Sequence, residues 1–143
     1  MNVYINNTRT FDSYTEQFHH HDLMLANGVM ACANRDQHKI DFPADGDLIA
    51  IYANGLGVVA YGYATDDISL IEDERTGGHP TKIRRLRDFH MLAYPIHSSE
   101  YETSNTQTLS KVESDVDGFV ENLMDRKLPD PDCTLFSLAK NAG

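Results

Sequence analysis

The chain has 143 residues, 41 % hydrophobic and 24 % charged, which excludes an intrinsically disordered protein and suits one domain over residues 1–143. Its formal net charge of −10 argues against the long-range attraction to nucleic-acid backbones that basic proteins show. No apolar run is long enough to span a bilayer and the first ten residues lack a signal-peptide core, so we expect a cytoplasmic protein with no membrane partner.

The first elements are short. Alternating apolar residues predict a strand over residues 1–6. A short helix should follow, because Phe11, Tyr14 and Phe18 recur at helical spacing. Asn27-Gly28 then predicts a turn between two short apolar runs.

The clearest predicted element is a β-hairpin. Its strands, 47–53 and 58–64, flank Asn54-Gly55, and Asn-Gly between two apolar runs is a strong hairpin signal. Both strands are apolar on both faces, which predicts a central place in a sheet. Gly62, inside the second strand, predicts a bulge or a close approach of two backbones.

Beyond the hairpin we expect a polar loop over 66–80, a core strand over Phe89–Tyr94 and a capping box formed by Ser99 and Glu102. Apolar residues at helical spacing predict an amphipathic helix over 113–127. A last apolar strand or turn is expected over 134–139. This order predicts an α+β fold, with a small, mostly antiparallel, barrel-like sheet and flanking helices.

The hairpin sequence GDLIAIYANGLGVVAYGYA, residues 46–64, resembles the central hairpin of EVE-type domains in the PUA/ASCH/YTH-like superfamily. Residues 28–33 and 89–96 fall where such domains place further barrel strands, so the resemblance covers about residues 22–100. It implies a single EVE/PUA-like domain whose barrel mouth binds a nucleobase, a modified base or a nucleotide, alone or within a nucleic acid.

Aromatic residues are the candidate pocket walls for such a ligand. Tyr61 and Tyr63 share one strand face, Tyr52 lies across the hairpin, and His90 and Tyr94 share a face of the later strand. Aromatic rings stack on bases. The alternative is that these are core side chains with satisfied hydroxyl groups.

The candidate phosphate contacts are four basic residues in one segment of an otherwise acidic chain: Lys82, Arg84, Arg85 and Arg87. Arginine donors match phosphate oxygens in geometry and charge. The alternative is that these residues form ion pairs with the preceding acidic loop.

Carboxylates support a hypothesis of another class. They crowd residues 66–74 and 113–132, and the second segment carries seven acidic residues against two basic ones. A small acidic protein of this kind could mimic DNA, or act as a phage-type anti-defence protein, by contacting a host DNA-handling or defence protein.

Histidines raise two further hypotheses. Three consecutive side chains at His19-His20-His21 cannot all face one ion, so we expect no metal site. His79-Pro80-Thr81 and His97-Ser98-Ser99 resemble the paired motifs of 2H phosphoesterases, in which two histidines act as acid and base. Without further support for catalysis, we expect a non-catalytic protein with no cofactor, in which Cys32 and Cys133 are reduced, packed thiols.

Overall fold

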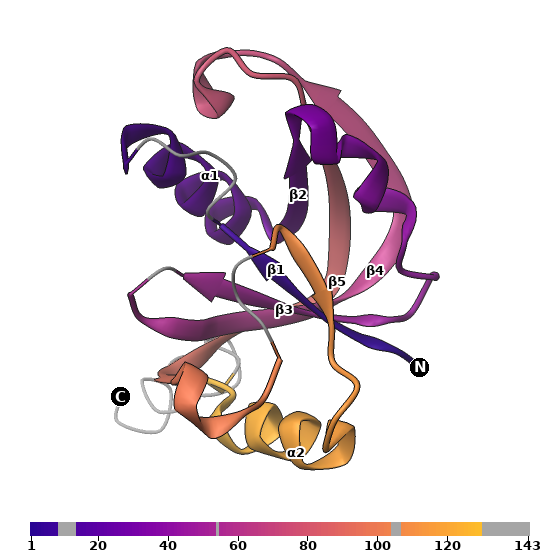
Figure 1. Ribbon diagram of the computed structural model, residues 1–143, viewed down its shortest axis with the longest axis vertical. Helices are drawn as coiled ribbons and strands as arrows, with labels where there is room; N and C mark the ends of the chain where they lie inside the picture. Colours follow the sequence, from indigo (N-terminus) through magenta and orange to yellow (C-terminus); the bar gives the residue numbers. More distant parts are fainter. Residues whose placement is uncertain (9–13, 54, 104–106, 130–143) are drawn as a thin grey trace, which may run out of the picture.

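A curled six-stranded sheet forms the body of the protein (Figure 1), as seen in a computed structural model that describes residues 1–8, 14–53, 55–103 and 107–129. The strands are β1 (Val3–Asn7), β2 (Val29–Ala33), β3 (Leu48–Ala53), β4 (Gly57–Ile71), β5 (Thr81–Ile96) and β6 (Leu109–Lys111). Their order across the sheet is β2-β5-β4-β3-β1-β6. β1 is parallel to β3, and the other four pairings are antiparallel. The expected α+β fold with a mostly antiparallel, barrel-like sheet is confirmed, and the curl forms half of a barrel.

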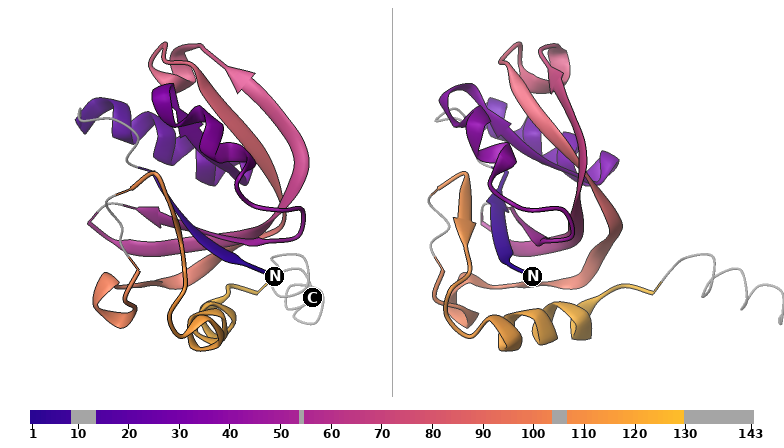
Figure 2. Two further views of the ribbon diagram at one scale, coloured as in Figure 1. Left: turned by 45° about the vertical axis from the view of Figure 1, so that its right-hand side comes forward. Right: turned by 90° about the vertical axis from the view of Figure 1, so that its right-hand side faces the viewer.

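Helices cover the two faces of this sheet (Figure 2). Helix α1 (Tyr14–Asn27) and the 3₁₀ helix η1 (Asn34–Asp41) lie on one face, and α2 (Val116–Arg126) lies on the other. Two apolar cores result. One contains Met24 of α1 and Ile40 of η1, and the other contains Phe119 and Leu123 of α2.

The central strand β3 divides the two cores. Ile49 and Ile51 pack on the side of α1 and η1, whereas Leu48 and Ala50 pack on the side of α2. All four side chains are fully buried. Successive side chains of a strand point to opposite faces, so a strand that is buried on both faces needs apolar residues throughout. The predicted central hairpin is confirmed. Asn54, in its turn, lies outside the described residues.

Gly62 marks a close approach between β4 and β5, as predicted. A Cβ atom added there would lie 2.8 Å from the Cβ of Leu86 and 3.3 Å from the Arg87 carbonyl oxygen. The β4–β5 register also shifts between Tyr61 and Tyr63. A larger residue would therefore collide at the bend of the sheet.

The polar loop expected over 66–80 is shorter than predicted. β4 continues to Ile71 and pairs with residues 81–84 of β5, leaving a connection that contains the 3₁₀ helix η2 (Glu74–Thr76). Residues 66–70 are exposed, because this end of the β4–β5 hairpin extends beyond the cores. Ile68 and Leu70 of this segment are exposed on a strand, so the acidic residues beside them mark exposure and not a loop.

Three other boundaries differ from expectation. α1 extends to Asn27 and includes the apolar run around Leu23, which packs in helical form. β5 begins at Thr81 and continues through Pro95. The capping box belongs to the 3₁₀ helix η3 (Ser98–Glu100), where His97 and Glu100 form it in place of Ser99 and Glu102.

The helix expected over 113–127 is confirmed as α2. Phe11, within the first predicted helix, and the segment 134–139 lie outside the described residues. No helix in the described ranges combines the length and the apolar character needed to cross a membrane.

Candidate functional site

The structure brings most of the predicted aromatic set together on the α2 side of the sheet. Tyr52, Tyr61 and Tyr63 pack in the same core, and the Tyr61 ring centroid lies 6.2 Å from that of Tyr63 and 5.7 Å from that of His90. Tyr61 is only 2 % exposed, and its hydroxyl donates a hydrogen bond to the Met124 sulfur at 3.4 Å. Burial raises the pKa of this phenol. Tyr61 therefore supports the core and offers no open ring face for stacking.

Tyr94 is separate from that group and is 58 % exposed. The Arg126 guanidinium of α2 lies 4.5 Å from its ring centroid, within cation–π range. The Arg87 guanidinium lies in a similar way 5.7 Å from the Tyr63 ring centroid. Tyr63 and Tyr94 thus each contact an arginine guanidinium, but the two rings do not form one pocket wall.

Arg84 is buried, which corrects its assignment as a phosphate contact. It is 3 % exposed, and its guanidinium donates hydrogen bonds to the carbonyl oxygens of Ile40 (3.0 Å), Pro43 (2.6 Å) and Thr65 (2.5 Å). The exposed Asp66 carboxylate lies 3.6 Å from Nη2. A buried guanidinium needs hydrogen-bond acceptors, and these three carbonyl groups supply them. Arg84 therefore joins η1 and the turn after it to the sheet.

The other basic residues do not converge on one ligand position. Arg85 is exposed and lines a small hollow of about 230 Å³ with Arg75 and Asn27. Lys82 is half-buried, and Arg87 lies over Tyr63. Successive side chains of a strand point to opposite faces, so a run of basic residues on β5 cannot act as one clamp.

The histidine motifs are also held apart. His79 precedes β5 and His97 follows it, so a strand of 16 residues separates them. The His97 Nδ1 accepts a hydrogen bond from the Ser99 backbone N–H at 3.2 Å and begins η3. The pair is therefore not assembled as an acid and a base. Within the described ranges, no group of three or more His, Cys, Asp or Glu side chains could hold a metal ion, and the side chains of His19 and His20 lie outside them.

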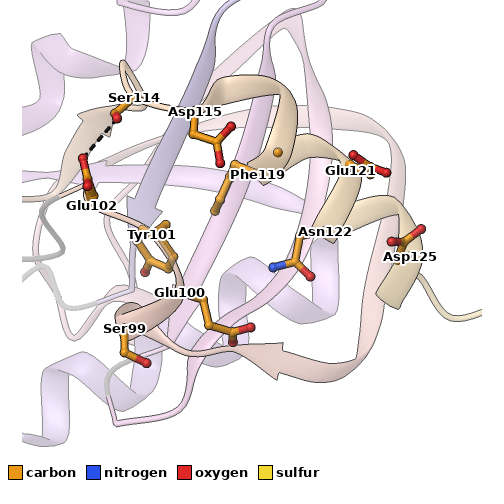
Figure 3. Close-up of a pocket in the computed structure, with 11 residues that line it drawn as sticks. Ser99, Glu100, Tyr101, Glu102, Ser114, Asp115, Phe119, Glu121, Asn122 and Asp125 are labelled. Carbon is orange, nitrogen blue, oxygen red and sulfur yellow. Dashed lines mark hydrogen bonds between the residues drawn. The ribbon is translucent and has the colours of Figure 1, made fainter.

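A groove of about 520 Å³ lies between the segment 99–102 and helix α2 (Figure 3). Apolar residues at helical spacing bury one side of α2, so its carboxylates remain on the other. Among the residues that the structure describes, no basic side chain lines the groove, and five carboxylates do: Glu100, Glu102, Asp115, Glu121 and Asp125. We name this feature the anionic groove.

Two aromatic rings line the same groove. Tyr101 and Phe119 pack edge to face, with their ring centroids 5.3 Å apart and an interplanar angle of 70°. Phe119 is only 4 % exposed and Tyr101 is half-buried, so a cation in this groove would meet carboxylate oxygens and the Tyr101 ring. Guanidinium and ammonium groups prefer this combination.

One carboxylate of the anionic groove is already neutralised. Arg126 Nη2 lies 2.5 Å from Glu100 Oε1, and Nη1 donates to the Pro95 carbonyl oxygen at 2.6 Å. The hydrogen bond from Arg126 holds the pKa of Glu100 below its usual value, and the backbone N–H of His97 adds to the effect. Glu102 accepts a hydrogen bond from the Ser114 hydroxyl at 3.1 Å. The groove therefore keeps a strong negative charge despite Arg126.

A second hollow, of about 700 Å³, adjoins the first. Glu102 and Ser114 line both. The second hollow also contains apolar side chains, Tyr4, Phe42 and Leu109, around strand β6. We name it the edge hollow.

The acidic segment 113–132 is evident in the sequence, but nothing in the sequence places Glu100 and Glu102 beside it. These two residues come from the short segment around η3, and only the packing of that segment against α2 makes a groove. The capping box at His97 and Glu100 was the available signal for a turn that would fix this segment. No protein-family model matches the chain, and no curated protein matches it significantly.

Proposed function

We propose that the protein is a non-catalytic binding protein that receives cationic side chains of a partner protein in its anionic groove. The observation that carries this proposal is the lining of the groove, in which five carboxylates and the half-buried Tyr101 ring occur without a basic side chain from the described residues. The planar guanidinium group of arginine can donate two N–H groups to one carboxylate and can stack on an aromatic ring. Arginine is therefore the side chain that suits this lining best.

Electrostatics favour a protein partner over nucleic acid at this position. The net charge of −10 and the groove carboxylates repel phosphate but attract a basic surface from a distance. Glu121 and Asp125 are four residues apart on α2, so they form a short row of negative charge along the helix. This supports the hypothesis of an acidic, DNA-mimicking or anti-defence protein that acts on a DNA-handling protein.

Calorimetric titration with a seven-arginine peptide tests the groove. The double variant Glu121→Gln/Asp125→Asn should weaken binding about fivefold, because each exposed ion pair contributes roughly 0.2–1 kcal/mol. The control Glu72→Gln/Asp117→Asn removes the same charge from exposed residues that do not line the groove, and it should change binding less than about twofold.

Salt dependence completes this test. Binding should weaken strongly between about 50 mM and about 300 mM salt, because the charges lie near solvent and are screened. Equal losses in the groove variant and in the control would mean that only net charge attracts the peptide, and the groove would lose its assigned role. Absence of binding at low salt would also contradict the proposal.

We propose nucleobase binding by an EVE/PUA-like half-barrel as the second candidate. Its support is the curled sheet together with the Arg87 guanidinium over the half-buried Tyr63 ring, next to Tyr61 and His90. Nucleotides and modified-base oligonucleotides should then shift the NMR signals of Tyr63 and Arg87. Shifts confined to α2, or none at saturating nucleotide, would contradict this candidate.

A further inference from the structure

We propose that the partner presents an extended basic peptide, which adds as a strand to the outer edge of β6 and continues with its arginine or lysine side chains into the anionic groove. This inference rests on the proposed function, since it uses the same groove. It goes further by assigning the backbone of the ligand a binding position. Four observations support it.

The first observation is the open edge of β6, the last strand of the sheet. The Asn7 N–H donates to the Thr108 carbonyl oxygen and the Val112 N–H donates to that of Val3, both from one side of this segment. Because hydrogen-bonding direction alternates along a strand, Leu109 and Lys111 direct their backbone groups away from β1. No described strand pairs with that edge.

The second observation is that the edge hollow lies along β6, since all three residues of this strand, Leu109, Ser110 and Lys111, line it. Tyr4 and Leu109 belong to the core on the α1 side. Ser110, which also lines the hollow, pairs with Ile5 of the other core. The hollow therefore follows the length of β6, so a strand added at its open edge would lie inside the hollow.

The third observation is an apolar anchor point. Phe42 is 56 % exposed and lines the edge hollow with Tyr4 and Leu109. Alternate side chains of an added strand would point to this side, and one apolar side chain there would cover the exposed ring. The Ser110 hydroxyl, beside the same edge, is buried and has no hydrogen-bond partner in the described part of the chain.

The fourth observation is continuity with the anionic groove. The Ser114 hydroxyl and Glu102, joined by their 3.1 Å hydrogen bond, line both hollows. A strand that leaves the β6 edge at this point enters the anionic groove directly. The occupant is therefore a peptide with an apolar residue near one end and basic residues near the other. Glu113 lines the edge hollow beside Lys111, and the five carboxylates of the anionic groove follow, so the route as a whole would repel a phosphate backbone.

The experiment uses the whole protein and a synthetic peptide of alternating valine and threonine that ends in three arginines. Binding should slow hydrogen exchange at the Leu109 and Lys111 amides, which the added strand would cover. A second peptide of the same sequence, N-methylated at alternate residues, keeps every charge but cannot pair as a strand. Its affinity should be at least about tenfold lower, and it should not protect those amides.

Matched protein variants test the anchor. Phe42→Ser should weaken the valine–threonine peptide about fivefold or more and leave the seven-arginine peptide unaffected, because that probe needs only the groove. Leu56→Ser is the control, since Leu56 is 55 % exposed but lies in the β3–β4 turn outside both hollows. Leu56→Ser should bind both peptides as the unchanged protein does.

The outcomes separate this inference from the proposed function. Binding of the seven-arginine peptide, together with unprotected Leu109 and Lys111 amides in the presence of the strand peptide, would overturn strand addition and retain the groove. Equal affinity of the N-methylated peptide would also overturn it. Failure of both peptides to bind would overturn the groove and the inference together.

Discussion

Arg126 and Glu100 join helix α2 to the segment that follows β5. Their side chains meet at 2.5 Å, and the same guanidinium donates to the Pro95 carbonyl oxygen and lies over the Tyr94 ring. Glu100 lies on one wall of the anionic groove, and Arg126 belongs to the helix that forms the other wall. One arginine thus joins the two walls and pairs with only one of the five groove carboxylates.

The Glu100 carboxylate should make the free energy of unfolding depend on pH. Its pKa is lower in the folded protein, so its contribution is complete above the unfolded pKa, about 4.3, and is lost as pH falls through the folded value. Glu100→Gln should lower the free energy of unfolding near neutral pH. The difference from the unchanged protein should shrink below about pH 4, measured by urea unfolding at several pH values. A difference independent of pH would contradict this.

Arg84 should be essential for stability. Arg84→Met removes the donor for three carbonyl oxygens, two of which come from η1 and the turn after it. We expect the free energy of unfolding to fall by about 3 kcal/mol, since hydrogen bonds to charged groups contribute about 1.5–3 kcal/mol each and buried acceptors would be left unpaired. The control is Arg85→Met at the next, exposed position, which should change stability by less than about 0.5 kcal/mol. Similar losses in both variants would contradict the buried role.

Gly62 should tolerate no side chain. In Gly62→Ala the new methyl group would lie 2.8 Å from the Leu86 Cβ, and neither backbone can move without disturbing the β4–β5 pairing. Overpacking of this kind costs about 1–3 kcal/mol, so thermal unfolding should occur several degrees lower. An unchanged midpoint would mean that the two strands are farther apart than described.

Cys32 should be unreactive in the folded protein. Burial raises the pKa of its thiol to about 12, and the nearby Asp36 adds to the effect, so almost no thiolate exists near neutral pH. Iodoacetamide should leave the peptide containing Cys32 unmodified under native conditions and alkylate it fully in guanidinium chloride. Peptide mass mapping separates this residue from Cys133. Rapid native alkylation of Cys32 would contradict its burial.

Features encoded by neighbouring residues were predictable from the sequence. The β3–β4 hairpin depends on local turn chemistry and alternation, and α2 depends on the spacing of Phe119, Leu123 and their apolar neighbours. Both signals are contained in short windows, so no tertiary information was needed.

Features that depend on distant partners were not predictable in the same way. Residues 66–71 combine Asp66, Asp67 and Ser69 with three apolar residues, and they form a strand because residues 68–71 pair with β5. Arg84 looked like its exposed neighbour Arg85, and only the position of η1 makes it a buried donor. The anionic groove likewise required two segments that sequence separates, around η3 and along α2.

Strand β5 passes through both apolar cores, since Leu86 packs in one and Leu92 and Ile96 pack in the other. Detaching it would open the protein on both sides of the sheet at once. We therefore expect the two cores to unfold in one cooperative transition, although each lies on its own side of β3. Damage to the core beneath α1 should therefore also lower the stability of helix α2 on the opposite side of the sheet.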